Sequence, residues 1–205
     1  GQRRYDVQQR QRLWRDHHQP AAGEVTVGIM GLGVMGRDAA DVLSRLGFRV
    51  VGWSRTVKTL AGVEMCYGHA DLAAFLARSE IVVCLLPHTP DTAGILNLVT
   101  FRGMKRDGAL GGAYLINAGR GALQVDLDIL AALDQGVLAG ATLDVFPTEP
   151  LPPDSPLWTH PKVTVTPHSA AESDPRALVM RVLDQISRHE RGLALNDVID
   201  RAAGY

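Results

Sequence analysis

The feature that most constrains the fold is a glycine-rich turn between two apolar segments near the N-terminus. Residues 25–30 (VTVGIM) form a short, β-branched apolar run, which is typical of a buried parallel strand. The turn GLGVMG at residues 31–36 has the spacing G-x-G-x-x-G, and apolar residues then recur at helical intervals up to Gly47. A second apolar run at residues 48–53 (FRVVGW) completes a strand–turn–helix–strand unit, the context in which this motif indicates dinucleotide binding.

Each glycine of the turn has a separate physical role. Gly31 permits the tight turn, Gly33 lets the backbone approach a pyrophosphate, and Gly36 lets the helix pack closely on the strand. Unpaired N–H groups and the dipole at the helix N-terminus then favour phosphate charge. A purely structural turn is the alternative. We predict that the pyrophosphate is bound by the residues at the start of the helix: Gly31, Gly33, Val34, Met35 and Gly36.

The end of the second strand indicates which dinucleotide is bound. An NAD-preferring site has an acidic residue about 20 residues after the motif, where it accepts hydrogen bonds from the ribose 2′-hydroxyl. Here Trp53, Ser54 and Arg55 occupy that place, Lys58 follows, and the first carboxylate is Glu64. A ribose 2′-phosphate would be bonded by Ser54 and by the arginine fork. The sequence therefore favours NADP over NAD, with an ordinary solvated basic loop as the alternative reading.

The composition excludes several classes of protein. The 205 residues are 46% hydrophobic and 21% charged, which suits one globular core. A net charge of −1 provides no electrostatic footprint for nucleic acid or an anionic membrane. The longest apolar run, residues 81–86, is too short to cross a bilayer, and the arginine-rich N-terminus lacks a signal core. Cys66 and Cys84 form no C-x-x-C pair, so we expect a reduced, cytoplasmic protein without nucleic-acid or membrane partners.

Strand-like and helical segments alternate along the chain, which predicts an α/β fold with a doubly wound parallel sheet of Rossmann type and three αβα layers. Asp71 and Thr92 are expected to cap helices, and Pro175 to open the last one. The stretch from Phe101 to Gly112 is expected to be irregular. After the first two, the predicted strands are residues 61–67, 81–86, 113–117, 139–145 and 163–166, and the later helices are residues 71–78, 92–98, 126–135 and 174–191.

Three polar residues follow predicted strands, where ligands of such sheets bind. They are Arg120 in NAGRG, Glu149 in DVFPTEP and His168 in TPHSA. Singly, each has an ordinary alternative as a surface or loop residue. Together they have complementary chemistry, because an arginine holds a carboxylate bidentately, a histidine donates a proton near neutral pH, and a glutamate favours the imidazolium.

Several stretches resemble the D-isomer-specific 2-hydroxyacid dehydrogenases, and most closely their NADPH-dependent glyoxylate/hydroxypyruvate reductase branch. The resemblance covers nearly the whole chain. The stretches that carry it are VGIMGLGVMG, GFRVVGWSRT, LLPHTPDT, LINAGRGA, LAALDQGVLAGATLDVFPTEPLPPDSPLWTHP, VTVTPHSAA and DRAAGY.

The resemblance implies a role for each strand-end residue. Arg120 would bind and polarise a 2-oxo acid, His168 would be the acid/base, and Glu149 would set the charge of His168. Asp144 would contact the nicotinamide carboxamide. NADPH would give hydride to the carbonyl carbon of glyoxylate or hydroxypyruvate. The further residues expected at the cofactor groove are Leu86, Pro87, Thr92, Asn117, Ala118, Gly119 and Ala170.

The resemblance also implies the domain organisation. Residues 1–20 would be a connecting helix, residues 21–170 the dinucleotide-binding domain, and residues 171–205 a helix and tail returning to a substrate domain. Most of that substrate domain precedes the matched segment in the family, so we expect one wall of the substrate cleft to be formed by residues outside this sequence. The resemblance implies a homodimer. The stretch from Met104 to Gly112 is longer than the usual turn of the family.

Two other functions compete with the reductase. One is a non-catalytic NADP(H)-binding or interaction module, or an inactive fragment of such an enzyme. The other is a 3-hydroxyacid dehydrogenase related to 6-phosphogluconate dehydrogenase, which places a catalytic lysine on a later helix. Lys105 and Lys162 do not lie on helices of the predicted fold, so this reading fails. No metal site is predicted, because the histidines lack ligand spacing: His17, His18, His69, His88 and His160.

Overall fold

A seven-stranded sheet forms the centre of the molecule. The computed structural model describes residues 2–171, 173–196 and 198. Every strand pairs in parallel, in the spatial order β3-β2-β1-β4-β5-β6-β7. The strands are β1 (Thr26–Met30), β2 (Arg49–Ser54), β3 (Val63–Tyr67), β4 (Ile81–Cys84), β5 (Ala113–Asn117), β6 (Leu138–Leu143) and β7 (Val163–Val165).

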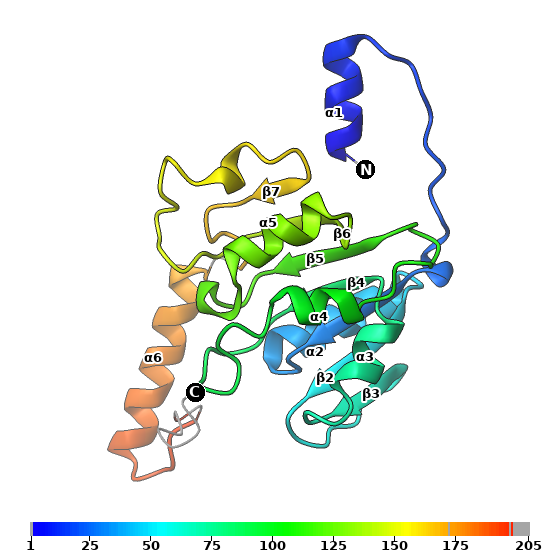
Figure 1. Cartoon of the computed structure of the whole chain (residues 1–205). Helices are drawn as coiled ribbons and strands as arrows, with labels where there is room; N and C mark the ends of the chain where they lie inside the picture. The colour runs from blue at the N-terminus through cyan, green and yellow to red at the C-terminus, as the bar shows by residue number, and fades with distance from the viewer. Residues whose placement is uncertain (1, 172, 197, 199–205) are drawn as a thin grey trace.

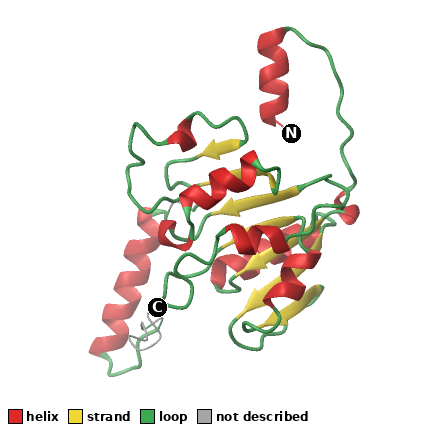
Figure 2. Cartoon of the chain, viewed as in Figure 1, coloured by secondary structure: helices red, strands yellow, loops and turns green. Residues whose placement is uncertain are grey.

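Helices cover both faces of the sheet, as Figures 1 and 2 show. α2 packs on β1 and β2 from one side, whereas α3, α4 and α5 form the layer on the other side. The predicted three-layer αβα fold of Rossmann type is therefore confirmed. The helices are α1 (Gln2–Gln11), α2 (Val34–Arg45), α3 (Leu72–Arg78), α4 (Leu98–Gly103), α5 (Asp126–Asp134) and α6 (Pro175–Glu190), with 3₁₀ turns at Ala22–Glu24, Gly121–Leu123 and Pro156–Trp158.

The apolar core follows these layers. A large cluster that includes Phe75, Phe101 and Leu138 fills the space under α3, α4 and α5. A smaller cluster of Ile29, Leu32, Ala40 and Val50 lies under α2. The buried sides of α2, α3, α4 and α5 determine where these helices lie on the sheet, because removing apolar area from water is the main favourable term in folding.

Two helices project from this body. α1 stands apart and is joined to it by the extended residues 12–21 (Figure 1). α6 begins at Pro175, as predicted, and has no buried residue among those described, although it carries exposed Leu178, Val179 and Met180. Within the described part of the chain, no helix is long and apolar enough to cross a bilayer. The terminal stretch DRAAGY lies outside the described residues.

The helix predicted for residues 92–98 is wrong. The Thr92 hydroxyl donates to the Pro87 carbonyl at 2.7 Å and accepts from the Thr89 N–H at 2.8 Å, so it closes a local turn. The helix begins later, at Leu98, where the Asn97 side chain accepts from the first free N–H groups. Asn97 is the stronger capping residue of the two, and its helix extends into a stretch expected to be irregular.

The predicted capping role of Asp71 is also wrong, although α3 begins directly after this residue. The Asp71 side chain makes no capping hydrogen bond. Its carboxylate instead accepts from the Tyr67 N–H at 2.8 Å, which fixes the turn after β3. The Asp71 carboxylate therefore stabilises the turn before α3 and does not cap the helix.

A buried carboxylate holds the segment between α4 and β5. Glu80 is fully buried, and its two oxygens accept from the Thr26 and Leu110 N–H groups, each at 3.1 Å. Gly108 packs directly on it, since a Cβ there would lie 2.0 Å from a Glu80 carboxylate oxygen. Glu80 therefore fastens the long segment before β5 to the start of β1.

Glu80→Ala is expected to lower the free energy of unfolding by about 2–4 kcal/mol, because it leaves the buried N–H group of Thr26 and the partly buried N–H group of Leu110 without acceptors. Urea unfolding measures this change. Glu64→Ala is the matched control: its carboxylate pairs with Arg78 at the surface, and its removal should cost less than about 1 kcal/mol. Equal losses in the two variants would contradict the role of Glu80.

Candidate active site

The glycine turn lies where the strand order reverses, between β1 and its neighbours β2 and β4. Gly31 has φ +99°, and a Cβ there would lie 2.8 Å from the Leu85 carbonyl. A Cβ on Gly36 would lie 1.9 Å from the Gly31 oxygen, whereas one on Gly33 would meet nothing within 4 Å. The turn is thus closed on its protein side and open at Gly33, at the N-terminus of α2, which is the cradle that a pyrophosphate requires.

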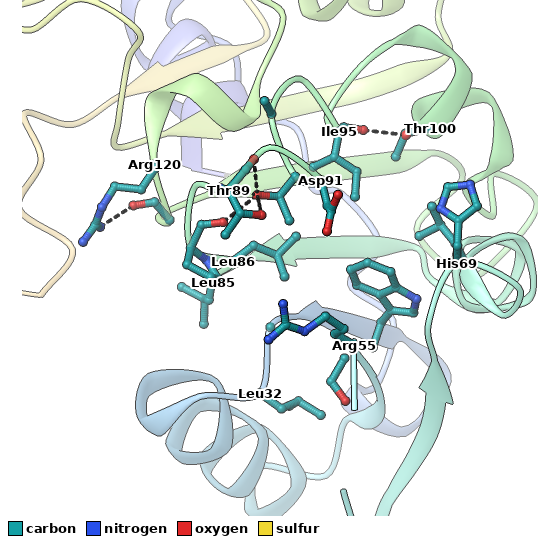
Figure 3. Close-up of a pocket in the computed structure, with 18 of the residues that line it drawn as sticks. Leu32, Arg55, His69, Leu85, Leu86, Thr89, Asp91, Ile95, Thr100 and Arg120 are labelled. Atoms are coloured by element: carbon teal, nitrogen blue, oxygen red, sulfur yellow. Dashed lines mark hydrogen bonds between the residues drawn. The ribbon is translucent and has the colours of Figure 1, made fainter. Parts of the chain in front are cut away.

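A cavity of about 1570 Å³ opens in front of this turn. Figure 3 shows Leu32 and Arg55 on one side, Thr89 and Asp91 on the opposite side, and Arg120 and His69 at the two ends. The volume exceeds that of a typical drug-sized pocket and suits an extended ligand. The cavity therefore runs from the glycine turn, past the ends of β2 and β4, to the turn after β5.

The cavity brings together most of the predicted cofactor residues. Predicted residues that line it are Gly31, Gly33, Met35, Trp53, Ser54, Arg55, Lys58, Leu86, Pro87, Thr92, Ala118, Gly119 and Arg120. Predicted residues that do not line it are Val34, Gly36, Asn117, Asp144, Glu149, His168 and Ala170. The cofactor and catalytic roles of all these residues stay predictions.

Two basic residues, Lys58 after β2 and Arg37 of α2, converge on one backbone oxygen. The Lys58 ammonium donates to the Leu32 carbonyl at 2.9 Å, and the Arg37 guanidinium donates to the same oxygen at 3.3 Å. Burial lowers the pKa of Lys58, and the charge of Arg37 lowers it further. Because an ammonium has three donors, Lys58 keeps donors for an anion while it braces the glycine turn.

Trp53 and Ser54 have structural partners. The Trp53 indole is buried and donates to the Gly68 carbonyl at 2.8 Å, and the Ser54 hydroxyl donates to the Thr56 carbonyl at 2.6 Å. These bonds fix the loop that carries Arg55. Both residues thus shape the wall of the cavity, and a Ser54 hydroxyl oxygen can still accept a hydrogen bond.

The register of three neighbouring strands explains why the catalytic candidates share one edge. Asn117 of β5 pairs with Leu143 of β6, which pairs with Val165 of β7. Arg120 and His168 each come three residues after the outer members of this row. Parallel strands end at the same edge, so both residues emerge on the cofactor side of the sheet.

His168 and Glu149 form a pair. The His168 Nδ1 lies 2.8 Å from a Glu149 carboxylate oxygen, and the other oxygen accepts from the Phe146 N–H at 2.9 Å. Both bonds, the one from His168 first, hold the pKa of Glu149 below its usual range. A carboxylate only accepts, so Nδ1 donates, and Nε2 of the half-exposed imidazole stays available to a substrate.

Asp144 holds the turn that carries His168. Its carboxylate accepts from the Thr166 hydroxyl and from the Ser169 and Ala170 N–H groups, and its carbonyl accepts from the His168 N–H at 2.8 Å. Burial opposes ionisation, but these hydrogen bonds outweigh it and lower the pKa of Asp144. His168 is thereby kept at φ +53°, a left-handed conformation that few non-glycine residues adopt.

Several residues that line the cavity were not among the predicted cofactor residues. Leu32 lies inside the glycine motif, and Thr89 and Asp91 belong to the loop that already contained Pro87, so their positions carried a signal. His69 and Leu72 come from beyond β3, and no local pattern marked them. Among the described residues, no group of three or more His, Cys, Asp or Glu side chains could hold a metal ion.

The fold and the glycine cradle define a dinucleotide-binding domain of Rossmann type, and comparison with known proteins identifies its family. Residues 1–170 match the NAD-binding domain of the D-isomer specific 2-hydroxyacid dehydrogenases. The chain belongs to this family.

Individual relatives indicate one branch of this family. Over 203 residues it is 45% identical to glyoxylate/hydroxypyruvate reductase A of Serratia proteamaculans, covering 98% of this chain and 63% of that protein. The NADPH-dependent glyoxylate/hydroxypyruvate reductase of Sinorhizobium meliloti, solved with NADP and sulfate, is 53% identical with a TM-score of 0.96 and covers all of this chain and 64% of that one. A family member from Xanthobacter autotrophicus Py2, solved with NADPH and MES, is 42% identical with a TM-score of 0.93, covering 99% and 82%.

These relatives bear out the resemblance seen in the sequence, at the level of family and branch. The chain spans about 63% of the length of the curated relatives. The activity in the names of these relatives therefore belongs to longer chains than this one.

Gly33→Ala and Gly36→Ala are expected to separate cofactor binding from folding. The Cβ of Gly33→Ala enters open space, so stability should change by less than about 1 kcal/mol. Binding of NADPH should weaken at least about tenfold, because the methyl holds the pyrophosphate away from charge-assisted donors.

Gly36→Ala should instead cost about 1–3 kcal/mol of stability or more, because its Cβ overlaps the Gly31 oxygen. Thermal unfolding and NADPH fluorescence titration measure the two effects. An unchanged NADPH affinity in Gly33→Ala would show that the pyrophosphate does not approach this turn.

Proposed function

We propose that this chain is the coenzyme-binding part of an enzyme that reduces a small 2-oxo acid, glyoxylate or hydroxypyruvate, with NADPH. The observation that carries the proposal is the His168–Glu149 pair, at 2.8 Å, at the same sheet edge as Arg120 and the cavity. A proton donor, a carboxylate-binding cation and a dinucleotide cradle are the groups that this reduction requires.

The chemistry can be assigned to individual atoms. When bound, NADPH supplies the hydride for the carbonyl carbon. The Arg120 guanidinium binds the substrate carboxylate and polarises the neighbouring carbonyl. The imidazolium of His168 donates its Nε2 proton to the carbonyl oxygen, and Glu149 stabilises the positive charge from the Nδ1 side.

Basic residues near the end of β2 support the preference for NADPH. Arg55 and Lys58 line the cavity, and Lys58 and Arg37 meet at the Leu32 carbonyl, so positive charge gathers where a ribose 2′-phosphate would lie. The region holds Ser54 in place of the carboxylate that would repel a phosphate. The relatives solved with NADP and NADPH are consistent with this choice.

The proposal includes an arrangement of domains. Residues 1–20 would connect to a substrate domain, residues 21–170 would bind the dinucleotide, and residues 171–205 would return to the substrate domain. The exposed apolar side chains of α6 support this arrangement, since such a face needs a partner. The homodimer implied by the family resemblance belongs to the same proposal.

A second function is favoured by one observation. The side chain of His168 is half exposed. A cofactor-binding module without turnover would have this property, because exposure to water weakens the electrostatic interactions of a catalytic site.

The reductase is tested by NADPH oxidation with hydroxypyruvate, followed at 340 nm, with NADH as the parallel cofactor. Saturable turnover that prefers NADPH is expected. His168→Ala should lower turnover by about 10²–10⁴-fold and leave NADPH affinity unchanged, because it removes only the proton donor. His18→Ala, in the extended segment before the sheet, is the control and should match the wild type. Binding of NADPH without turnover would favour the module.

Arg55→Ala should weaken NADPH binding by about tenfold or more and leave NADH binding within about twofold, because a guanidinium–phosphate contact is worth about 1.5–3 kcal/mol. Fluorescence titration with each cofactor measures the two affinities. Arg49→Ala, at the opposite end of the same strand, is the matched control and should change neither. Equal losses for NADPH and NADH would contradict the assignment of Arg55 to the 2′-phosphate.

A further inference from the structure

A chain of buried amides lies beneath the turn that carries Arg120. Asn117 and Gln124 are buried, and the Asn117 Nδ2 donates to the Gln124 Oε1 at 2.8 Å. The Gln124 Nε2 in turn donates to the Asp126 carboxylate at 2.9 Å. Because that carboxylate accepts, it selects one orientation of the Gln124 amide, and Gln124 then selects one orientation of the Asn117 amide.

The orientation of the Asn117 amide determines the backbone around Arg120. The Asn117 Oδ1 accepts from the Gly119 N–H at 3.1 Å, and its Nδ2 also donates to the Arg120 carbonyl at 3.3 Å. The guanidinium is tied to the same place, since it donates to the Gly119 carbonyl at 2.7 Å (Figure 3). An Asn117 amide turned by 180° would present a donor to the Gly119 N–H and an acceptor to the Arg120 carbonyl, and both bonds would be lost.

The segment that contains Gln124 lies behind the wall of the cavity. Residues 122–125 run parallel to residues 94–96, of which Gly94 and Ile95 line the cavity on the side of Thr92. Three backbone hydrogen bonds join the two segments: Gly94 N–H to Ala122 at 3.0 Å, Leu96 N–H to Leu123 at 2.8 Å, and Val125 N–H to Leu96 at 3.0 Å. The backbone on both sides of Gln124 is therefore held by these bonds, and its side chain is available to bond Asn117 under the turn that carries Arg120.

We propose that Gln124 is a positioning residue for Arg120: it holds the Asn117 amide in the one orientation that places the guanidinium at the edge of the cavity. This inference rests on the proposed function, in which Arg120 binds the carboxylate of the 2-oxo acid. A role in packing alone is the competing explanation. An apolar residue of similar volume would preserve packing and would not preserve the direction of the hydrogen bonds.

Two substitutions and one rescue separate these explanations. Gln124→Leu keeps the volume and removes both hydrogen bonds. Gln124→Glu sets a carboxylate oxygen against the Asp126 carboxylate, where two acceptors repel, so the new side chain is displaced from Asn117. Adding Asp126→Asn to Gln124→Glu restores a donor–acceptor contact in the reverse direction. Gln135→Leu, in the exposed turn after α5, is the matched control.

Amide exchange and kinetics provide the readouts. Exchange of the Gly119 N–H, measured by NMR, should accelerate roughly five- to tenfold in Gln124→Leu and Gln124→Glu, the factor expected for the loss of one hydrogen bond. The KM for hydroxypyruvate at saturating NADPH should rise by about the same factor, while the Kd for NADPH stays within about twofold. The Gln124→Glu/Asp126→Asn pair should return both quantities to within about twofold of the wild type.

Two results would overturn the inference. Wild-type exchange and KM in Gln124→Leu would mean that Gln124 only fills space. Failure of Asp126→Asn to improve on Gln124→Glu alone would mean that the direction of the bonds is immaterial. If the wild-type chain binds NADPH and shows no turnover, the proposed function fails, and exchange of the Gly119 N–H with its rescue still decides the role of Gln124.

Discussion

The position of α2 and of the glycine turn before it depends on the close contact between Gly36 and the Gly31 carbonyl. A Cβ on Gly36 would lie 1.9 Å from that oxygen, so α2 reaches its position on the sheet only because the side chain is missing. This contact directs the N-terminus of α2 at the cavity and leaves Gly33 open beside it. The bracing of Leu32 by Lys58 and Arg37 then adds positive charge next to the same turn. The backbone that a pyrophosphate can approach and the positive charge beside it thus both belong to the glycine turn and the residues that brace it.

At the other end of the cavity, the geometry depends on strand register. Asn117, Leu143 and Val165 lie side by side on neighbouring strands, so the residues that follow them leave the sheet at the same end. Asp144, which follows the middle strand, then binds the hydroxyl and N–H groups around His168. Two of the three catalytic candidates are therefore positioned by different means: Arg120 by the proposed amide chain under its turn, and His168 by Asp144, which follows a neighbouring strand.

The sequence predicted the sheet well because all seven strands are apolar runs bounded by glycine, proline or polar residues. It also predicted that Arg120, Glu149 and His168 share an edge, which follows from parallel strands alone. It failed where a side chain had two local uses: Thr92 closes a turn in place of capping a helix, and Asp71 binds the turn before its helix. The partners of Asp144 lie 22–26 residues away and those of Asn117 are defined by buried amide orientation, so no local pattern announces them.

Backbone hydrogen bonds join residues 94–96 to residues 122–125, and this pairing has a consequence for protein engineering. One segment forms a wall of the cavity and the other carries the turn after β5, and three backbone bonds make them a single unit. A loop of different length, grafted into either segment from another dehydrogenase, would disturb the other one. Exchange of cofactor or substrate preference at this end of the cavity should therefore transfer both segments as one cassette, with Gln124 and Asn117 included.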